Sequence, residues 1–170
     1  MLSVSLRLAF VLSTICILQC EAACETFWTE HNGKCYRYYG TPYMNWRGAE
    51  DNCIEQGGHL ASILSKEDEN FILEMWRSSR DEFHKEGMYP WKKEVSIVYI
   101  GLYAPQKDGN YIWSDGSDVT YTNWARDQPS NGVENSVLIW DWPNMEGTWN
   151  DVNENTKAIL GPSICAKPEN

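Results

Sequence analysis

Residues Trp124–Asp151 read WARDQPSNGVENSVLIWDWPNMEGTWND, and the rest of the chain is organised around this stretch. Its first part carries a group of oxygen-bearing side chains beside one proline, namely Gln128, Ser130, Asn131, Glu134 and Asn135. Its last two residues, Asn150 and Asp151, add two more after a tryptophan. Calcium takes roughly six to eight oxygen ligands. A loop and an incoming strand would together supply most of such a shell, so the stretch predicts a calcium site.

Four cysteines, Cys24, Cys35, Cys53 and Cys165, lie outside the first 22 residues. An even number in an exported chain indicates two disulfides. Cys24 and Cys35 flank Asn32-Gly33, a strong hairpin signal, so a bridge between them would close a hairpin. Cys53 is then left to pair with Cys165. Zinc is the alternative, but the spacings contain no C-x₂-C pair.

The first 22 residues have the pattern of a secretory signal peptide. Arg7 precedes an apolar run from Leu8 to Leu18, and the small residue Ala22 marks the expected cleavage point. A membrane anchor is the alternative, but the run is shorter than the roughly 20 apolar residues that span a bilayer. We therefore expect a signal peptide over residues 1–22, one secreted, extracellular domain over residues 23–170 and no membrane insertion.

The chain is acidic and rich in aromatic residues. Its net charge of −10 makes it a poor partner for the phosphate backbone of a nucleic acid. Nine Trp and nine Tyr supply large, rigid side chains. We expect Trp46, Trp113, Trp124 and Trp149 in the core, and some of the other aromatic residues at a binding surface.

Two helices are expected in the first half of the chain. One begins after the N-cap Asn45 and ends at Gly57-Gly58. The other follows a capping box at Ser65–Asp68, where the acidic run Glu67–Glu69 would form a charged first turn, and Arg77–Glu86 would be its solvated end or a loop.

Short β-rich runs fill the second half: Val95–Leu102, Tyr111–Trp113, Val119–Trp124, Val137–Trp140, Gly147–Trp149 and Ser163–Ala166. Helices followed by short antiparallel strands with long loops indicate an α+β domain.

Five motifs then identify a resemblance. They are YIGL at Tyr99–Leu102, WSDGS at Trp113–Ser117, YTNW at Tyr121–Trp124, QPS at Gln128–Ser130 and WND at Trp149–Asp151. Their order, with the framing cysteines, resembles C-type lectin domains over Cys24–Lys167. The resemblance implies an α+β fold with two helices, short antiparallel sheets, a long calcium-binding loop region and the disulfides Cys24–Cys35 and Cys53–Cys165.

The resemblance also implies a site and an activity. Its calcium ligands would be Gln128, Ser130, Glu134, Asn150 and Asp151, with a cis peptide before Pro129. Two carboxylates would balance the charge of one Ca²⁺. Coordination positions left open would accept two vicinal hydroxyls of a sugar, which the same side chains would also bind. The implied protein is a calcium-dependent lectin with glycan partners and no enzymatic activity.

The sugar class is less sharply indicated. Galactose-type sites of the family carry Gln-Pro-Asp and mannose-type sites Glu-Pro-Asn, so Gln128 favours galactose, whereas Ser130 matches neither pattern. A galactose-type site also stacks an aromatic ring on the sugar. Trp140 and Trp142 are the nearest candidates, and Trp142, in the loop before Asn144, is favoured.

The chain departs from the family at two further places. Ser136 and Glu154 occupy the positions of a disulfide that usually braces the loops, so the loops would depend on packing and on the metal. An auxiliary calcium site of many members looks lost, because Ala104 stands where an acid is usual and Asn131 and Asn135 are neutral. Ser130 and the missing brace motivate an alternative, a lectin-like domain that binds a protein, a mineral or ice.

An enzyme is not expected. His31, His59 and His84 are scattered, and no nucleophile pattern accompanies them. There is no heptad neck to force trimers, and an oligomer remains compatible with the sequence.

Overall fold

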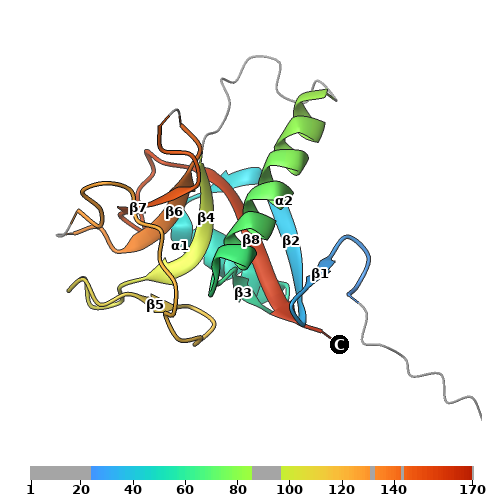
Figure 1. Ribbon diagram of the computed structural model, residues 1–170, viewed down its shortest axis with the longest axis horizontal. Coiled ribbons are helices and arrows are strands. Elements are labelled where there is room, and N and C mark those ends of the chain that lie inside the picture. The colour runs from blue at the N-terminus through green and yellow to red at the C-terminus, as the bar shows by residue number, and fades with distance from the viewer. Residues whose placement is uncertain (1–23, 86–96, 131–132, 143, 170) are drawn as a thin grey trace, which may run out of the picture.

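The computed structural model describes residues 24–85, 97–130, 133–142 and 144–169 (Figure 1). The expected signal peptide at residues 1–22 lies outside them. Among the helices that are described, none has the length and apolarity needed to cross a membrane.

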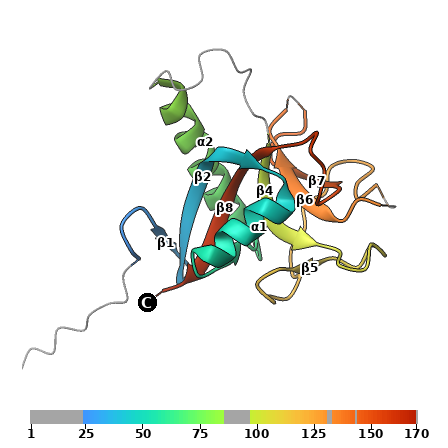
Figure 2. The ribbon, with the colours of Figure 1, turned by 180° about the vertical axis from the view of Figure 1, so that it is seen from behind.

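The described chain forms two helices and one mixed sheet, which confirms the α+β class. The strands are β1 (Thr29–His31), β2 (Lys34–Met44), β3 (His59–Leu60), β4 (Ile97–Tyr103), β5 (Ile112–Trp113), β6 (Ser136–Trp140), β7 (Thr148–Val152) and β8 (Gly161–Pro168). The helices are α1 (Trp46–Glu55) and α2 (Lys66–Lys85). Figures 1 and 2 show α2 on one face of the sheet and α1 on the other.

The sheet pairs strands from the beginning and the end of the domain, β2 and β8, and β8 lies beside the central strand β4. Its order is β1-β2-β8-β4-β6-β7, with β3 paired to β8 and β5 to β4. The strands form a single sheet rather than separate antiparallel ones, because β4 and β8 pair in parallel through Tyr99 and Ser163. At the other edge β6 and β7 pair antiparallel, with Val137 opposite Asp151 and Leu138 opposite Asn150. This register fixes the position of the last two candidate ligands.

The expected hairpin and both disulfides are confirmed. Asn32 and Gly33 have positive φ angles of 48° and 74° and form the turn between β1 and β2. Cys24 is bonded to Cys35, with their Cα atoms 5.5 Å apart. The second disulfide joins Cys53 of α1 to Cys165 of β8.

Both helices begin at the predicted caps. The Asn45 side chain accepts a hydrogen bond from the Gly48 N–H, and the Ser65 hydroxyl accepts one from the Asp68 N–H. Helix α2 continues through Lys85, so the segment from Arg77 is its end and not a loop. Arg77 is held there by a 2.6 Å ion pair with Asp141.

The acidic run Glu67–Glu69 forms the first turn of α2, as expected. Glu67 is exposed, but Asp68 and Glu69 are buried and bonded to side chains from other parts of the chain. Two of the three acids of this charged turn are therefore also structural groups of the interior.

The strand expected at Val119–Trp124 is wrong. Within the described part of the chain, the only ladder contact of this segment is an isolated bridge between Trp124 and Trp149. Its side chains hold it instead: the Tyr121 hydroxyl donates to Glu69 and the Thr120 hydroxyl donates to the Leu64 carbonyl. A segment of high β propensity is thus attached to the core as a loop, because propensity depends on the neighbours that a strand finds.

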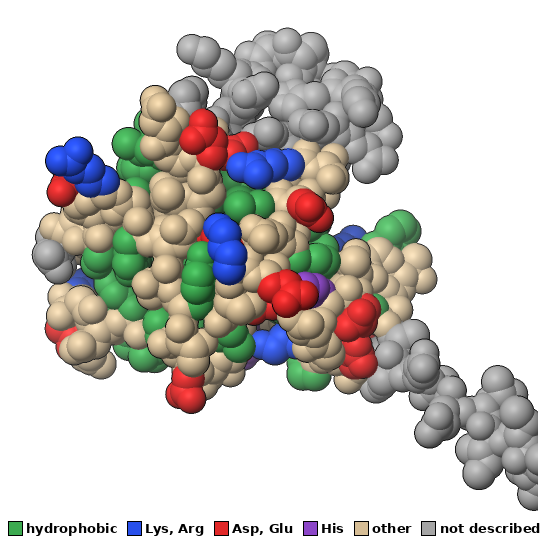
Figure 3. Space-filling view, in the orientation of Figure 1, with side chains coloured by type: hydrophobic (Ala, Val, Ile, Leu, Met, Phe, Trp, Pro, Cys, Tyr) green, Lys and Arg blue, Asp and Glu red, His purple; other side chains and the backbone are tan. Residues whose placement is uncertain are grey.

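Several large aromatic side chains lie in the core among aliphatic ones. Trp46, Trp113 and Trp149 are fully buried as expected, whereas Trp124 is partly buried and packs against the core. On the face drawn in Figure 3, described acidic and basic side chains are scattered among uncharged and apolar ones.

Candidate functional site

The candidate loop starts from a fixed point beside β7. The Ala125 N–H donates to the Trp149 carbonyl at 2.9 Å, and the Gln128 N–H donates to the Ala125 carbonyl at 3.1 Å. The Gln128–Pro129 peptide is cis, which confirms the prediction. The loop therefore leaves the sheet next to the strand that carries Asn150 and Asp151.

Ser130 lies between two carboxylates that are far apart in the sequence. Its backbone N–H donates to Asp151 Oδ1 at 2.9 Å. Its hydroxyl donates to Glu134 Oε2 at 2.5 Å and lies 3.4 Å from Asp151 Oδ2. The structure thus brings together three of the five predicted ligands, with Ser130 in contact with both carboxylates.

Asp151 is fully buried, and a third group contacts it. The Tyr111 hydroxyl donates to Asp151 Oδ2 at 3.1 Å. Burial raises the pKa of Tyr111, and the negative charge of Asp151, its hydrogen bond and the charge of Glu134 raise it further. The phenol therefore keeps its proton and remains a donor at neutral pH.

Asn150 is buried next to Asp151. Its Nδ2 donates to the Asp151 carbonyl at 2.8 Å, which orients the amide and leaves Oδ1 as the oxygen for a ligand.

Gln128 supplies an oxygen with no described partner. Its Oε1 is buried and accepts no hydrogen bond from any described residue. Buried polar atoms are nearly always paired, so an orphaned acceptor at a predicted ligand position points to a missing partner.

One predicted sugar-binding residue shares no described contact with this cluster. Trp142 is 50% exposed and stacks on Trp140 with centroids 5.5 Å apart. Among the described side chains, no hydrogen bond or ring contact joins it to Ser130, Glu134 or Asp151. Asn131 lies outside the described residues.

The donor set fits a hard divalent cation. Glu134 and Asp151 give two negative charges, and Gln128, Ser130 and Asn150 give neutral oxygens, the ligand type that calcium prefers. Within the described ranges, no ion pair involves either carboxylate, and no group of three or more His, Cys, Asp or Glu could hold a metal. Neutral oxygens would therefore form much of the shell.

The loop region has braces that sequence reasoning did not identify. Glu154, at one expected disulfide position, forms an ion pair with Arg47 of α1 and donates its N–H to Asn135 Oδ1 at 3.2 Å. Burial alone would raise the pKa of Glu154, but hydrogen bonds from Arg47 and Asn135 and the charge of Arg47 lower it. The Ser136 hydroxyl donates to the Val152 carbonyl at 2.9 Å. The loops do not depend on apolar packing and metal alone.

Tyr111 was also missed by sequence reasoning. It lies just before β5, outside every motif, and its contact with Asp151 spans 40 positions. No local pattern could have indicated it.

Comparison with known proteins gives consistent matches. The family model described as Lectin C-type domain matches residues 43–167. The alpha-N-acetylgalactosamine-specific lectin of Patiria pectinifera is 38% identical over 143 residues, which cover 81% of this chain and 77% of that lectin.

Solved structures also match most of the chain. A calcium-independent type II antifreeze protein is 28% identical, with a TM-score of 0.69, and the match covers 87% of this chain and 96% of that chain. Human lithostathine is 22% identical, with a TM-score of 0.72, and the match covers 89% of this chain and 94% of that chain. The second likeness concerns the fold alone.

Proposed function

The chain belongs to the family of C-type lectin domains, and we propose that it is a secreted, calcium-dependent lectin for galactose-type sugars. It is a binding domain and not an enzyme. The observation that carries the proposal is the position of Ser130 between the carboxylates of Glu134 and Asp151.

Five side chains would hold the ion: Gln128, Ser130, Glu134, Asn150 and Asp151. When bound, calcium would supply the positive charge that these oxygens lack and open positions for two vicinal sugar hydroxyls. Glu134 would accept hydrogen bonds from those hydroxyls, and the amide groups of Gln128 and Asn150 would donate to them. Hydrogen bonds to the charged carboxylate are the strong ones of this set.

Two observations support the galactose class. Gln128 has the residue type of galactose-type sites, and the relative that is 38% identical is named for a galactose derivative, N-acetylgalactosamine. The half-exposed ring of Trp142 is the proposed stacking surface for the apolar face of the sugar.

The direct test is retention on immobilised N-acetylgalactosamine, galactose and mannose, with calcium and with a chelator. We expect retention on the first two resins that the chelator abolishes. Glu134→Ala should lose retention, while the charge-matched control Glu67→Ala, at an exposed position of α2, should keep it. Retention that survives the chelator, or none on any glycan, overturns the proposal.

Secretion forms part of the same proposal. The two disulfides are consistent with an oxidising compartment. Expression in a secreting cell should release a chain whose N-terminal sequence begins after Ala22. A released chain that retains residues 1–22 would contradict the signal-peptide prediction.

A second candidate is binding to a surface such as ice without sugar. The 28% identity to a calcium-independent antifreeze protein supports it, as does Ser130, a weaker calcium ligand than a carboxylate or amide. The discriminating measurement is thermal hysteresis in a chelator. A hysteresis gap in the absence of glycan retention would favour this candidate.

A further inference from the structure

We propose that Tyr111 is a positioning residue of the site: its hydroxyl fixes the carboxylate of Asp151 in the orientation that a divalent cation needs. This inference rests on the proposed calcium binding. It extends that proposal to a residue that would not touch the ion.

Each oxygen of the Asp151 carboxylate accepts a hydrogen bond from a different residue. Tyr111 donates to Oδ2 at 3.1 Å, and the Ser130 N–H donates to Oδ1 at 2.9 Å. A carboxylate oxygen can accept more than one hydrogen bond. The Ser130 hydroxyl also lies 3.4 Å from Oδ2, but it donates its one proton to Glu134. The two donors therefore set the plane of the group and leave a lone pair on each oxygen for a cation.

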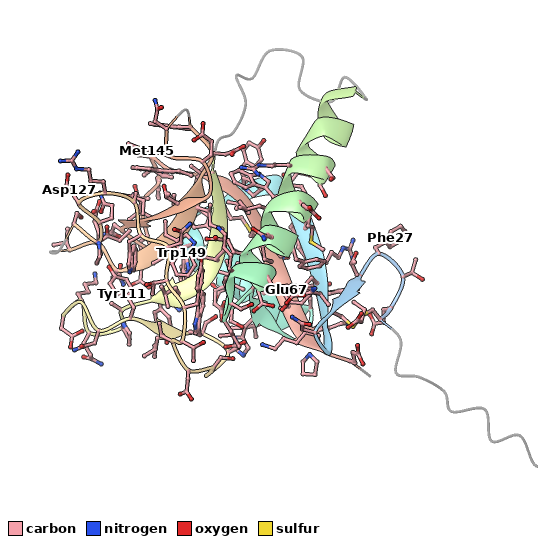
Figure 4. The ribbon with its side chains drawn as sticks, in the orientation of Figure 1. Phe27, Glu67, Tyr111, Asp127, Met145 and Trp149 are labelled. Atoms are coloured by element: carbon pink, nitrogen blue, oxygen red, sulfur yellow. A yellow bond between two sulfur atoms is a disulfide. The ribbon has the colours of Figure 1, made fainter. Side chains whose placement is uncertain are left out.

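The Tyr111 ring is held independently of its hydroxyl. It packs on Trp124 with centroids 5.0 Å apart, and Trp124 contacts the buried Trp149 with centroids 6.0 Å apart. Figure 4 shows Tyr111 at the same end of the molecule as Asp127, where the loop begins. Removing the hydroxyl should leave the ring in place and delete one hydrogen bond.

A neutral donor suits this position. A lysine or arginine there would neutralise Asp151 and compete with calcium for it. The phenol orients the carboxylate and leaves its charge for the ion. Partners that orient a ligating carboxylate typically contribute about 10–100-fold to metal affinity.

The chain offers a matched control. The Tyr121 hydroxyl donates to another buried carboxylate, Glu69, at 2.9 Å, and Glu69 is not among the proposed calcium ligands. Tyr111→Phe and Tyr121→Phe remove the same chemical group from the same kind of contact. Only the first removal should change calcium binding.

The experiment is calorimetric titration of the secreted chain and both variants with calcium, together with thermal unfolding in a chelator. We expect Tyr111→Phe to weaken calcium affinity about tenfold and Tyr121→Phe to leave it unchanged. Both variants should unfold at lower temperatures in the chelator. At saturating calcium, Tyr111→Phe should regain the sugar affinity of the parent chain, because it acts only through Asp151.

Three results would overturn the inference. Calcium binding by Tyr111→Phe as tight as that of the parent would refute the role of Tyr111 and leave the proposed function intact. An equal loss in both variants would assign the effect to general stability. A parent chain that binds no calcium would refute the proposed function and the inference together.

Discussion

The indole Nε1 of Trp149 donates a 3.0 Å hydrogen bond to Oε1 of Glu69, a residue 80 positions earlier in the chain. Asn123 Nδ2 donates to the same oxygen, and the Tyr121 hydroxyl and Lys66 Nζ donate to Oε2. Glu69 is fully buried. One carboxylate therefore connects α2, the loop before the candidate site and β7.

Replacing Glu69 should destabilise the whole domain. Glu69→Ala would leave several donors without an acceptor, and we expect a loss of about 3 kcal/mol or more in the free energy of unfolding. Glu67→Ala, at an exposed position in the same helical turn, should cost less than about 1 kcal/mol. Urea unfolding of both variants measures the difference, and equal losses would contradict the role of Glu69.

Stability should fall in acid partly through Asp115. Burial by itself would raise its pKa, but hydrogen bonds from Ser62, Lys34 and Ser117 outweigh burial and lower the pKa to about 2 from 3.8. A carboxyl whose pKa is depressed in the folded state stabilises above its unfolded pKa, and this contribution is lost as pH falls through the folded value. The stabilising contribution of Asp115 is therefore lost as pH falls from about 4 to about 2.

Asp115→Asn tests this assignment. The variant should be less stable than the parent at neutral pH and should approach it at about pH 2. Asp118→Asn, at an exposed position three residues later, should keep the parental profile. The measurement is the free energy of unfolding at several pH values across the acid range. If that of Asp115→Asn fell in parallel with that of the parent chain, the assignment would be refuted.

The two disulfides should contribute unequally. Cys53–Cys165 spans 112 positions and Cys24–Cys35 spans 11. Loop-closure entropy predicts stabilisation of about 5 kcal/mol for the longer loop and about 3 kcal/mol for the shorter. Replacing both cysteines of one bridge by serine, and then those of the other, and measuring denaturant unfolding gives the stability lost with each disulfide. A larger loss of unfolding free energy from the short bridge would contradict the entropic account.

Patterns within a few neighbouring residues, and the order of short motifs along the chain, predicted much of this structure. The caps at Asn45 and Ser65 and the turn at Asn32-Gly33 each rest on contacts within a few residues. The cluster at Ser130 was predicted in outline because the family's motifs are short and occur in order. Whether its members bind calcium stays a prediction.

Long-range polar contacts were not predictable. Glu69 with Trp149, Tyr111 with Asp151 and Arg47 with Glu154 join positions that are 80, 40 and 107 residues apart. Such pairs leave no periodicity, since each partner lies among unrelated neighbours. The wrong strand at Val119–Trp124 has the same origin, because bonds to Glu69 and Leu64 hold that segment as a loop.

The ion pair of Arg47 and Glu154 should hold the loops locally. Glu154→Gln keeps the backbone bond to Asn135 and removes the charge. We expect a global loss below about 1 kcal/mol, which high salt should reduce, and faster amide exchange at Glu154. Asp127→Asn, which removes an exposed pair with Arg126, is the control and should change neither quantity. Unchanged exchange in Glu154→Gln would show that backbone bonds alone brace the loops.

The residue at position 130 should set the balance between stability and calcium affinity. Ser130→Asp would place a third carboxylate beside Glu134 and Asp151 and remove the hydroxyl that donates to Glu134. Without metal, repulsion among three negative charges should lower the unfolding temperature. With calcium, the added charge should tighten binding roughly tenfold, which corresponds to about 1.4 kcal/mol of extra stabilisation at saturating metal.

For position 130 we measure the unfolding temperature in calcium and in a chelator. The difference between the two temperatures should be larger for Ser130→Asp than for the parent chain. Ser130→Ala loses the same hydroxyl without gaining charge, so it should not widen the difference. If this temperature difference were smaller in Ser130→Asp than in the parent chain, the carboxylates of this cluster could not share one ion. The interaction between Ser130 and Glu134 would then be a structural hydrogen bond rather than part of a cation site.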